Sequence, residues 1–386
     1  ANRNQESCTQ NPGWVEIPNH KGYDYFQRQL AGMGIIAVSV DCNSTNCKAY
    51  GVINIEERAD LIIGSIDHFR VLNNDTNSLF FNKINFQSVG LMGHSRGGDA
   101  VVLVPERMTF TDVEIKCVIS LAPTYTGASS GQPQGYVFMT LLPAGDGDVW
   151  TNVGARFYDK AIPSPLKSQV YVHYTNHNFF NRQWPLDDSQ GMFDNPPVIS
   201  RGDHEQILSA YGSAIFRYAL LNHNYVVKFL TMYTIPKDVN YENIHLSFQF
   251  SNSLIVDNHE DNNTINSNSL NLPTTQTGSL TANEYFFGQG IGSFNDSFYG
   301  NSIGMVSTDT GINGIFRSQL QQNTNLEGKE IWLRTAEVYN LQGQLPFGKT
   351  GFRLGLEDNN GIQVWVDSEK VWSLPRPYYR GVSTTK

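Results

Sequence analysis

Between about residues 20 and 225, the chain alternates two kinds of hydrophobic pattern. Short continuous apolar runs are typical of buried strands, and longer segments with apolar residues every three or four positions are typical of amphipathic helices. This alternation predicts an α/β fold, with a mostly parallel sheet flanked by helices on both faces. The predicted strands are 35–40, 86–92, 113–121, 136–142 and 169–174, and the predicted helices are 22–33, 56–72, the segment after Ser95, and 205–221.

The pattern changes beyond Tyr233, where Pro236 interrupts the chain and helical periodicity of useful length ends. Short alternating segments separated by turn residues follow, which is the pattern of an all-β domain, most simply a two-sheet sandwich. These segments are 245–250, 303–307, 330–338, 351–356 and 361–366. We therefore predict an α/β domain over residues 1–235 and a jelly-roll-like β-sandwich over residues 236–386.

Composition narrows the classes of partner. The chain has 386 residues, a net charge of −9 and no cluster of Lys and Arg, which argues against a nucleic-acid partner. No apolar run reaches the roughly 18 residues of a transmembrane segment. The Asn-x-Ser/Thr sequences at Asn43, Asn74, Asn262 and Asn295, with little Lys and much Asn, Ser, Thr and Tyr, resemble an exported, extracytoplasmic protein.

Four cysteines add a candidate disulfide. Cys117 falls in an apolar run and is expected to be a buried thiol, whereas Cys8, Cys42 and Cys47 lie in polar loop sequence. One disulfide among these last three is the prediction.

The most specific motif is Gly93-His94-Ser95-Arg96-Gly97, which directly follows the apolar run 86–92. A G-x-S-x-G sequence between a strand and a helix can form a nucleophile elbow, a strained turn that exposes the serine hydroxyl. Gly93 and Gly97 are expected to leave room for the close approach of strand and helix. Ser95 is then the candidate nucleophile, and the backbone N–H of Arg96 the candidate oxyanion donor.

A nucleophilic serine needs a histidine base, and that histidine needs an acid to fix its tautomer. In this type of sheet the acid follows one strand and the histidine follows the next. Asp146 and Asp148 both follow the predicted strand 136–142. Asp146 is preferred because Val149, three residues later, completes the D-x-x-V pattern that is common in the acid loops of such sheets. The alternative is that this Gly-Asp-Gly-Asp sequence forms only a surface turn.

His177 is the candidate base because it lies just past the predicted strand 169–174. His173, expected within that strand, and His204, expected at the start of a helix, are the competing histidines. No metal-ligand spacing is apparent. Four aromatic side chains are expected either to line a pocket for apolar acyl or aromatic groups, or to pack in the core: His94, Trp150, Phe179 and Trp184.

Three of these segments resemble the serine-esterase branch of the α/β-hydrolase fold: 93–98 (GHSRGG), 145–149 (GDGDV) and 177–181 (HNFFN). The resemblance is to bacterial esterases and lipases related to chlorophyllases, cutinases and dienelactone hydrolases, and it covers roughly residues 15–225. It implies hydrolysis of a small-molecule or polymeric ester through an acyl-enzyme, with no cofactor. The C-terminal part is loosely similar to accessory jelly rolls, which implies a carbohydrate ligand for that domain.

Members of this family normally begin with two or three further strands, the last ending in a His-Gly motif that precedes the second oxyanion donor. Ala1 falls where the loop after that motif is expected. We expect that the sequence is truncated before Ala1, with residues 1–20 as replacement strands the alternative. Half of the oxyanion hole is then missing or lies on Ala1 or Asn2. Two other functions stay open: a peptidase with the same triad, and a catalytically inactive protein that binds ligands.

Overall fold

The computed structural model describes the chain in segments. They are residues 13, 15–47, 54–127, 130–149, 152–189, 198–231, 235–237, 239, 244–259, 265–278, 280–286, 302–307, 314–335 and 351–371.

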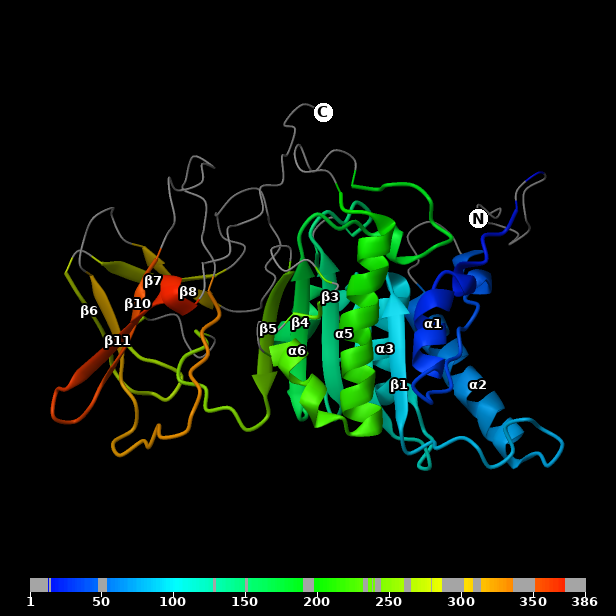
Figure 1. Cartoon of the computed structure of the whole chain (residues 1–386), viewed down its shortest axis with the longest axis horizontal. Helices are drawn as coiled ribbons and strands as arrows, with labels where there is room; N and C mark the ends of the chain where they lie inside the picture. The colour runs from blue at the N-terminus through cyan, green and yellow to red at the C-terminus, as the bar shows by residue number, and fades with distance from the viewer. Residues whose placement is uncertain are drawn as a thin grey trace. The chain divides into compact units, whose positions relative to one another are not determined.

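A five-stranded sheet forms the centre of the first unit, and its strands are hydrogen-bonded in sequence order from β1 to β5 (Figure 1). The first four run parallel, as the sequence predicts, and the last is antiparallel. β3 is buried at every residue, which accounts for a sequence that is apolar everywhere except at Thr140. The strands are β1 (Val89–His94), β2 (Ile115–Leu121), β3 (Val137–Pro143), β4 (Leu166–Val172) and β5 (Ile244–Phe250).

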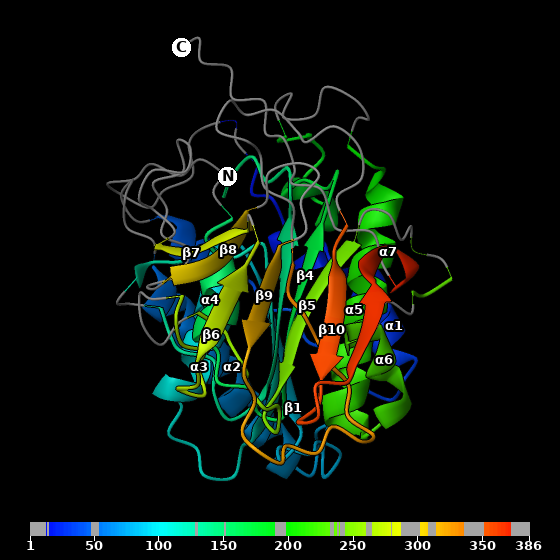
Figure 2. The same ribbon diagram turned by 90° about the vertical axis from the view of Figure 1, so that its left-hand side faces the viewer.

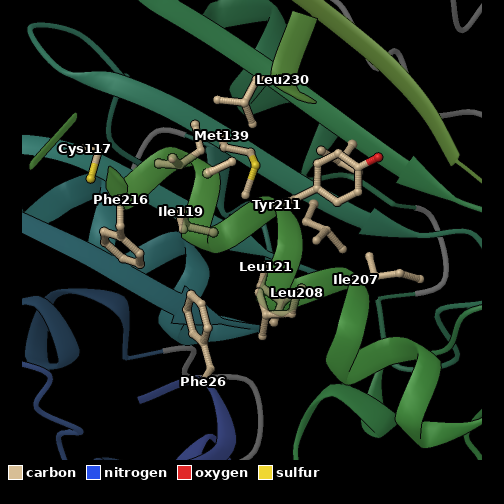
Figure 3. Close-up of a cluster of buried hydrophobic side chains, with 14 of the residues drawn as sticks. Phe26, Cys117, Ile119, Leu121, Met139, Ile207, Leu208, Tyr211, Phe216 and Leu230 are labelled. Carbon is tan, nitrogen blue, oxygen red and sulfur yellow. The ribbon is translucent and has the colours of Figure 1, made fainter. Parts of the chain in front are cut away.

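Helices cover both faces of this sheet (Figure 1). On one face α1 (Asp24–Ala31), α5 (Arg201–Leu221) and α6 (Lys228–Thr231) pack over a core that includes Ile119 and Met139 (Figure 3). On the other face lie α2 (Ile55–Asn74), α3 (Arg96–Arg107) and α4 (Ala155–Lys160). Successive side chains of a strand point to opposite faces, so neighbouring residues such as Val118 and Ile119 join different cores.

Two predicted strands need correction. Residues 35–40 have no strand hydrogen bonds, because within the described segments no neighbouring strand lies beside them to form a ladder. β4 starts at Leu166 and ends at Val172, which is earlier than predicted. His173 therefore lies just after the strand rather than within it.

The unit boundary also differs from the predicted one. The first unit extends to Ser253 and the second begins at Leu254, rather than at residue 236. The cause is β5, whose residues pair antiparallel with β4 from Leu166 to Val172. An alternating segment reads the same whether it closes one sheet or opens another, so the hydrophobic pattern assigned 245–250 to the wrong unit.

The second unit contains three two-stranded antiparallel sheets within its described segments (Figure 2). The segment 330–335, expected to begin a strand, is irregular. A complete β-sandwich therefore stays a prediction. The pairs are β6 (Thr274–Thr277) with β9 (Ile315–Ser318), β7 (Thr281–Phe286) with β8 (Ser302–Ser307), and β10 (Arg353–Glu357) with β11 (Gln363–Asp367), which is followed by the short helix α7 (Ser368–Val371).

Several expectations from composition can be placed on this fold. Cys117 is a buried free thiol as predicted, and Cys42 is also free. Cys8 and the side chain of Cys47 lie outside the described part, so a disulfide between them stays a prediction. Asn43 is buried, and its amide donates to the Ile17 carbonyl at 2.8 Å, so this sequon is closed to glycosylation in the folded protein. No helix in the described segments is long and apolar enough to cross a membrane.

Candidate active site

Ser95 occupies a strained turn between β1 and α3, the geometry expected of a nucleophile elbow. Its φ of 58° and ψ of −126° are unusual for a residue with a side chain. The turn is bonded to the end of β2, because the Ser95 N–H donates to the Leu121 carbonyl at 3.0 Å. The Gly98 N–H donates in turn to the Ser95 carbonyl at 2.8 Å.

The structure requires glycine at positions 93 and 98, whereas the sequence predicted positions 93 and 97. A Cβ on Gly93 would lie 1.9 Å from the Gly97 carbonyl oxygen, so only glycine fits there. A Cβ on Gly98 would lie 2.9 Å from Pro123 and 3.1 Å from the Leu121 carbonyl. A Cβ on Gly97 would meet nothing within 4 Å. The second position that requires a glycine is therefore 98 rather than 97, because a side chain on residue 97 would have open space around it.

Arg96 is the first residue of α3. The first N–H groups of an α-helix have no acceptor within the helix. The Arg96 N–H, next to Ser95, is thus in position to donate to an oxyanion on the serine. Ala1 and Asn2, considered for the second donor, lie outside the described residues.

Asp146 and His177 form a buried pair. Asp146 Oδ2 lies 2.9 Å from His177 Nδ1, and the two side chains are each only 1% exposed. The other carboxylate oxygen of Asp146 accepts the N–H groups of Val149 at 2.6 Å and Asp148 at 3.1 Å. The carboxylate is therefore fixed by its own loop and aimed at one histidine.

Asp148, the competing acid, lies differently. Its side chain is 69% exposed, and its Oδ2 is 3.5 Å from Nε2 of His177, the nitrogen opposite the Asp146 contact. Water screens such a carboxylate strongly. Asp148 can add to the electrostatic field on His177, but the buried hydrogen bond is made by Asp146.

The electrostatics of His177 follow from these neighbours. Burial lowers its pKa, but the charge and hydrogen bond of Asp146, with the charges of Asp148 and Asp188, outweigh burial, so the pKa lies above its ordinary value. His177 Nε2 is buried and has no hydrogen-bond partner in the described part of the protein, Ser95 Oγ included. This nitrogen is available to take a proton.

A carboxylate that the sequence analysis did not single out ties the acid loop to the histidine loop. Asp188 accepts N–H groups from Gly147 at 2.8 Å, Asn178 at 2.9 Å and His177 at 3.3 Å. It follows His177 by eleven residues in irregular sequence, where an aspartate resembles any polar loop residue. Only the folded loop brings these three donors to one side chain.

The other two histidines have separate partners. His204 is fully buried in α5, where its Nε2 accepts the Asn176 N–H at 3.0 Å and its Nδ1 lies 2.8 Å from the Ser200 carbonyl. Burial lowers the pKa of His204 to about 4. His173 packs on His245 with ring centroids 4.5 Å apart. His204 therefore supports the histidine loop from behind, and neither ring contacts Asp146.

His94 and Trp184 form an aromatic wall beside His177. The His94 ring centroid lies 4.4 Å from that of His177 and 4.9 Å from that of Trp184. The Trp184 ring is parallel to the His177 ring within 5°. His94 also hydrogen-bonds to the Tyr23 hydroxyl. Burial and then the nearby His177 lower the pKa of His94, which keeps it neutral.

Of the four expected lining residues, Phe179 does not lie at the site. Phe179 contacts the Arg201 guanidinium at 4.8 Å and the His204 ring at 5.4 Å, and it does not line the cavity. The short turn after His177 directs its side chain toward α5, which is the physical reason for this error. Trp150 lies outside the described residues.

Ser95 and His177 open onto one cavity of about 1330 Å³. Its wall also includes His94, Trp184 and Arg96. Comparison with known protein families found no match, and a search of curated proteins found no significant similarity.

Proposed function

We propose that this protein is a serine hydrolase that cleaves carboxylic esters through an acyl-enzyme on Ser95. The observation that carries the proposal is the buried hydrogen bond between Asp146 and His177. It leaves His177 Nε2 without a hydrogen-bond partner, 3.5 Å from the exposed Asp148 carboxylate, in the wall of the cavity that Ser95 also lines. A serine on a strained turn, a histidine with a free nitrogen and a buried acid are the groups that nucleophilic acyl transfer requires.

The first half-reaction forms the acyl-enzyme. Ser95 Oγ attacks the ester carbonyl while His177 Nε2 takes the hydroxyl proton, and the carbonyl oxygen becomes an oxyanion next to the Arg96 N–H. Asp146 stabilises the imidazolium that forms. When the intermediate collapses, the C–O bond to the alcohol breaks and His177 returns its proton to the leaving oxygen.

The second half-reaction repeats these steps with water. His177 Nε2 removes a proton from water, which attacks the acyl carbon, and Ser95 regains the proton as the acid leaves. The missing hydrogen bond between Ser95 and His177 does not oppose this role, because catalytic hydrogen bonds are often long until substrate binds. The proposed fold is that of an α/β-hydrolase, since the order Ser, Asp, His matches its strands.

Turnover of two substrate types tests the proposal. Short-chain 4-nitrophenyl esters should be hydrolysed, and Ser95→Ala should abolish the activity. Ser251→Ala, a change at an exposed serine next to β5, is the matched control and should keep it. Faster release from aminoacyl 4-nitroanilides than from the esters would instead favour the peptidase. If neither type of substrate is hydrolysed, the protein would be a catalytically inactive binding protein. The carbohydrate ligand of the second unit stays a prediction.

A further inference from the structure

The cavity that Ser95 lines also carries two arginines in its wall, and both donate to one neutral acceptor. Arg96 follows Ser95, and Arg58 comes from the first turns of α2. The guanidinium of Arg96 donates to Asn46 Oδ1 at 3.0 Å, and that of Arg58 donates to the same oxygen. All three residues line the cavity that contains Ser95 and His177. Two positive charges therefore converge on a single uncharged oxygen inside the cavity.

Arg58 is the less satisfied of the two cations. It is 5% exposed, and its Nε has no hydrogen-bond partner within the described segments. Neither Arg58 nor Arg96 forms an ion pair with a carboxylate in that part of the chain. Burial, and then the charge of Arg96, lower the pKa of Arg58 to about 10, and the neighbouring Cys42 thiol and Glu57 oppose this only in part.

A buried guanidinium is stable when its donors and charge are matched, and its planar fork fits a carboxylate with two parallel hydrogen bonds. The arrangement of Arg58 Nε, the two guanidinium groups and Asn46 offers several donors and lacks the anion. Arg96 directly follows Ser95 in the chain and, like Arg58 and Asn46, lines the cavity that Ser95 and His177 line.

We infer that Arg58 and Arg96 form an anion subsite, and that the ester substrate carries a carboxylate on its acyl chain. This inference rests on the proposed ester hydrolysis and adds the substrate class. The carboxylate accepts hydrogen bonds from both guanidinium groups, and Asn46 holds the two side chains in place when the subsite is empty. The preferred substrates are then monoesters of dicarboxylic acids rather than esters of simple fatty acids.

A matched pair of esters tests the subsite. 4-Nitrophenyl hemiglutarate and 4-nitrophenyl valerate have the same acyl length and differ in a terminal carboxylate or methyl group. The native protein should favour the hemiglutarate in kcat/KM, and Arg58→Gln should lower the ratio of the two about 10- to 100-fold, as expected for losing a charged hydrogen bond. Arg107→Gln, a change at a half-buried arginine paired with Asp60, is the control and should keep the ratio.

Two further measurements separate the possible failures. Arg96→Gln, which keeps the backbone N–H, should also lower the ratio, and it decides the question if Arg58→Gln does not fold. Calorimetry with glutarate on Ser95→Ala needs no turnover: saturable binding that Arg58→Gln or Arg96→Gln weakens at least about tenfold supports the subsite. A native preference for valerate, an unchanged ratio in both variants, or no glutarate binding would overturn the subsite. Absence of ester turnover with intact glutarate binding would overturn the hydrolase and leave the subsite standing.

Discussion

Replacing Asp146 by asparagine gives a sharp test of the site, because the change is nearly isosteric. An asparagine Oδ1 can still accept the N–H groups of Val149 and Asp148, so the acid loop should keep its shape. The new amide, however, faces His177 Nδ1 with a donor where the native oxygen lay 2.9 Å away. Nδ1 must then accept, and the imidazole proton moves to Nε2, where it blocks the base.

The size of the effect follows from the same geometry. At 2.9 Å and an effective dielectric constant of about 20, the attraction between the carboxylate and the imidazolium is about 6 kcal/mol. Because the imidazolium forms only during the reaction, this energy is lost mainly from the transition state. The expected fall in kcat is about 10⁴-fold, since each 1.36 kcal/mol is a factor of about ten, and this agrees with the tautomer effect known for triads.

The assay is ester turnover over a range of pH, with Asp148→Asn as the control. Asp148 is 69% exposed, so its loss should lower kcat less than about tenfold. His177 acts as a base only when neutral, and its pKa is raised in the folded protein, so activity should fall as pH drops through a value above about 6.5. Asp148→Asn removes one of the charges that raise this pKa and should shift that limb to lower pH.

Near-native turnover by Asp146→Asn would refute the reasoning. A larger loss in Asp148→Asn than in Asp146→Asn would identify Asp148 as the acid that orients the base.

Three further predictions concern the turn, the fold and the loops. Gly93→Ala should destabilise the protein by about 3 kcal/mol, because the new methyl group would clash with the Gly97 carbonyl oxygen. Gly97→Ala should leave the melting temperature unchanged or raise it, and equal effects of the two changes would contradict the elbow geometry. The pKa of His204 is depressed to about 4 in the folded protein, so its contribution to the free energy of unfolding is fully present above about pH 6.5 and is smaller by about 2 kcal/mol at pH 5. In urea unfolding at pH 7 and pH 5, His204→Gln should reduce the difference in unfolding free energy between the two pH values by that amount. Asp188→Ala leaves three backbone N–H donors without their acceptor and removes one negative charge near His177, so kcat should fall about 100-fold. The pH at which activity falls on the acidic side should also move lower, and an unchanged value would contradict an electrostatic role of Asp188.

Much of the sheet was predictable, because buried parallel strands have continuous apolar sequences. β3 is buried at every position, and its boundaries differ from the prediction by one residue at each end. The prediction of a strand at 35–40 was wrong, because an apolar sequence forms a strand only where another strand lies beside it, and the described segments contain none there. The strand at 245–250 was predicted, but its place beside β4 was not, because pairing partners far apart in sequence leave no local signal.

The candidate site divides in a similar way. Ser95, Asp146 and His177 could be proposed because each lies shortly after the end of a strand, and strand ends are visible in the hydrophobic pattern. Asp188 and Arg58 could not, since their roles depend on how loops and α2 close over the strand ends. Phe179 shows the limit of composition: an aromatic residue near a site in sequence can still point to another helix.

The central claim is that Ser95 is an activated nucleophile, and its most direct test is covalent labelling. A fluorophosphonate should attach to one residue per chain, and mass spectrometry of the peptides should place the label on Ser95. Labelling should disappear in Ser95→Ala, persist in Ser251→Ala, and slow as pH falls through the raised pKa of His177. An unlabelled native protein, or a label on another residue, would contradict the account.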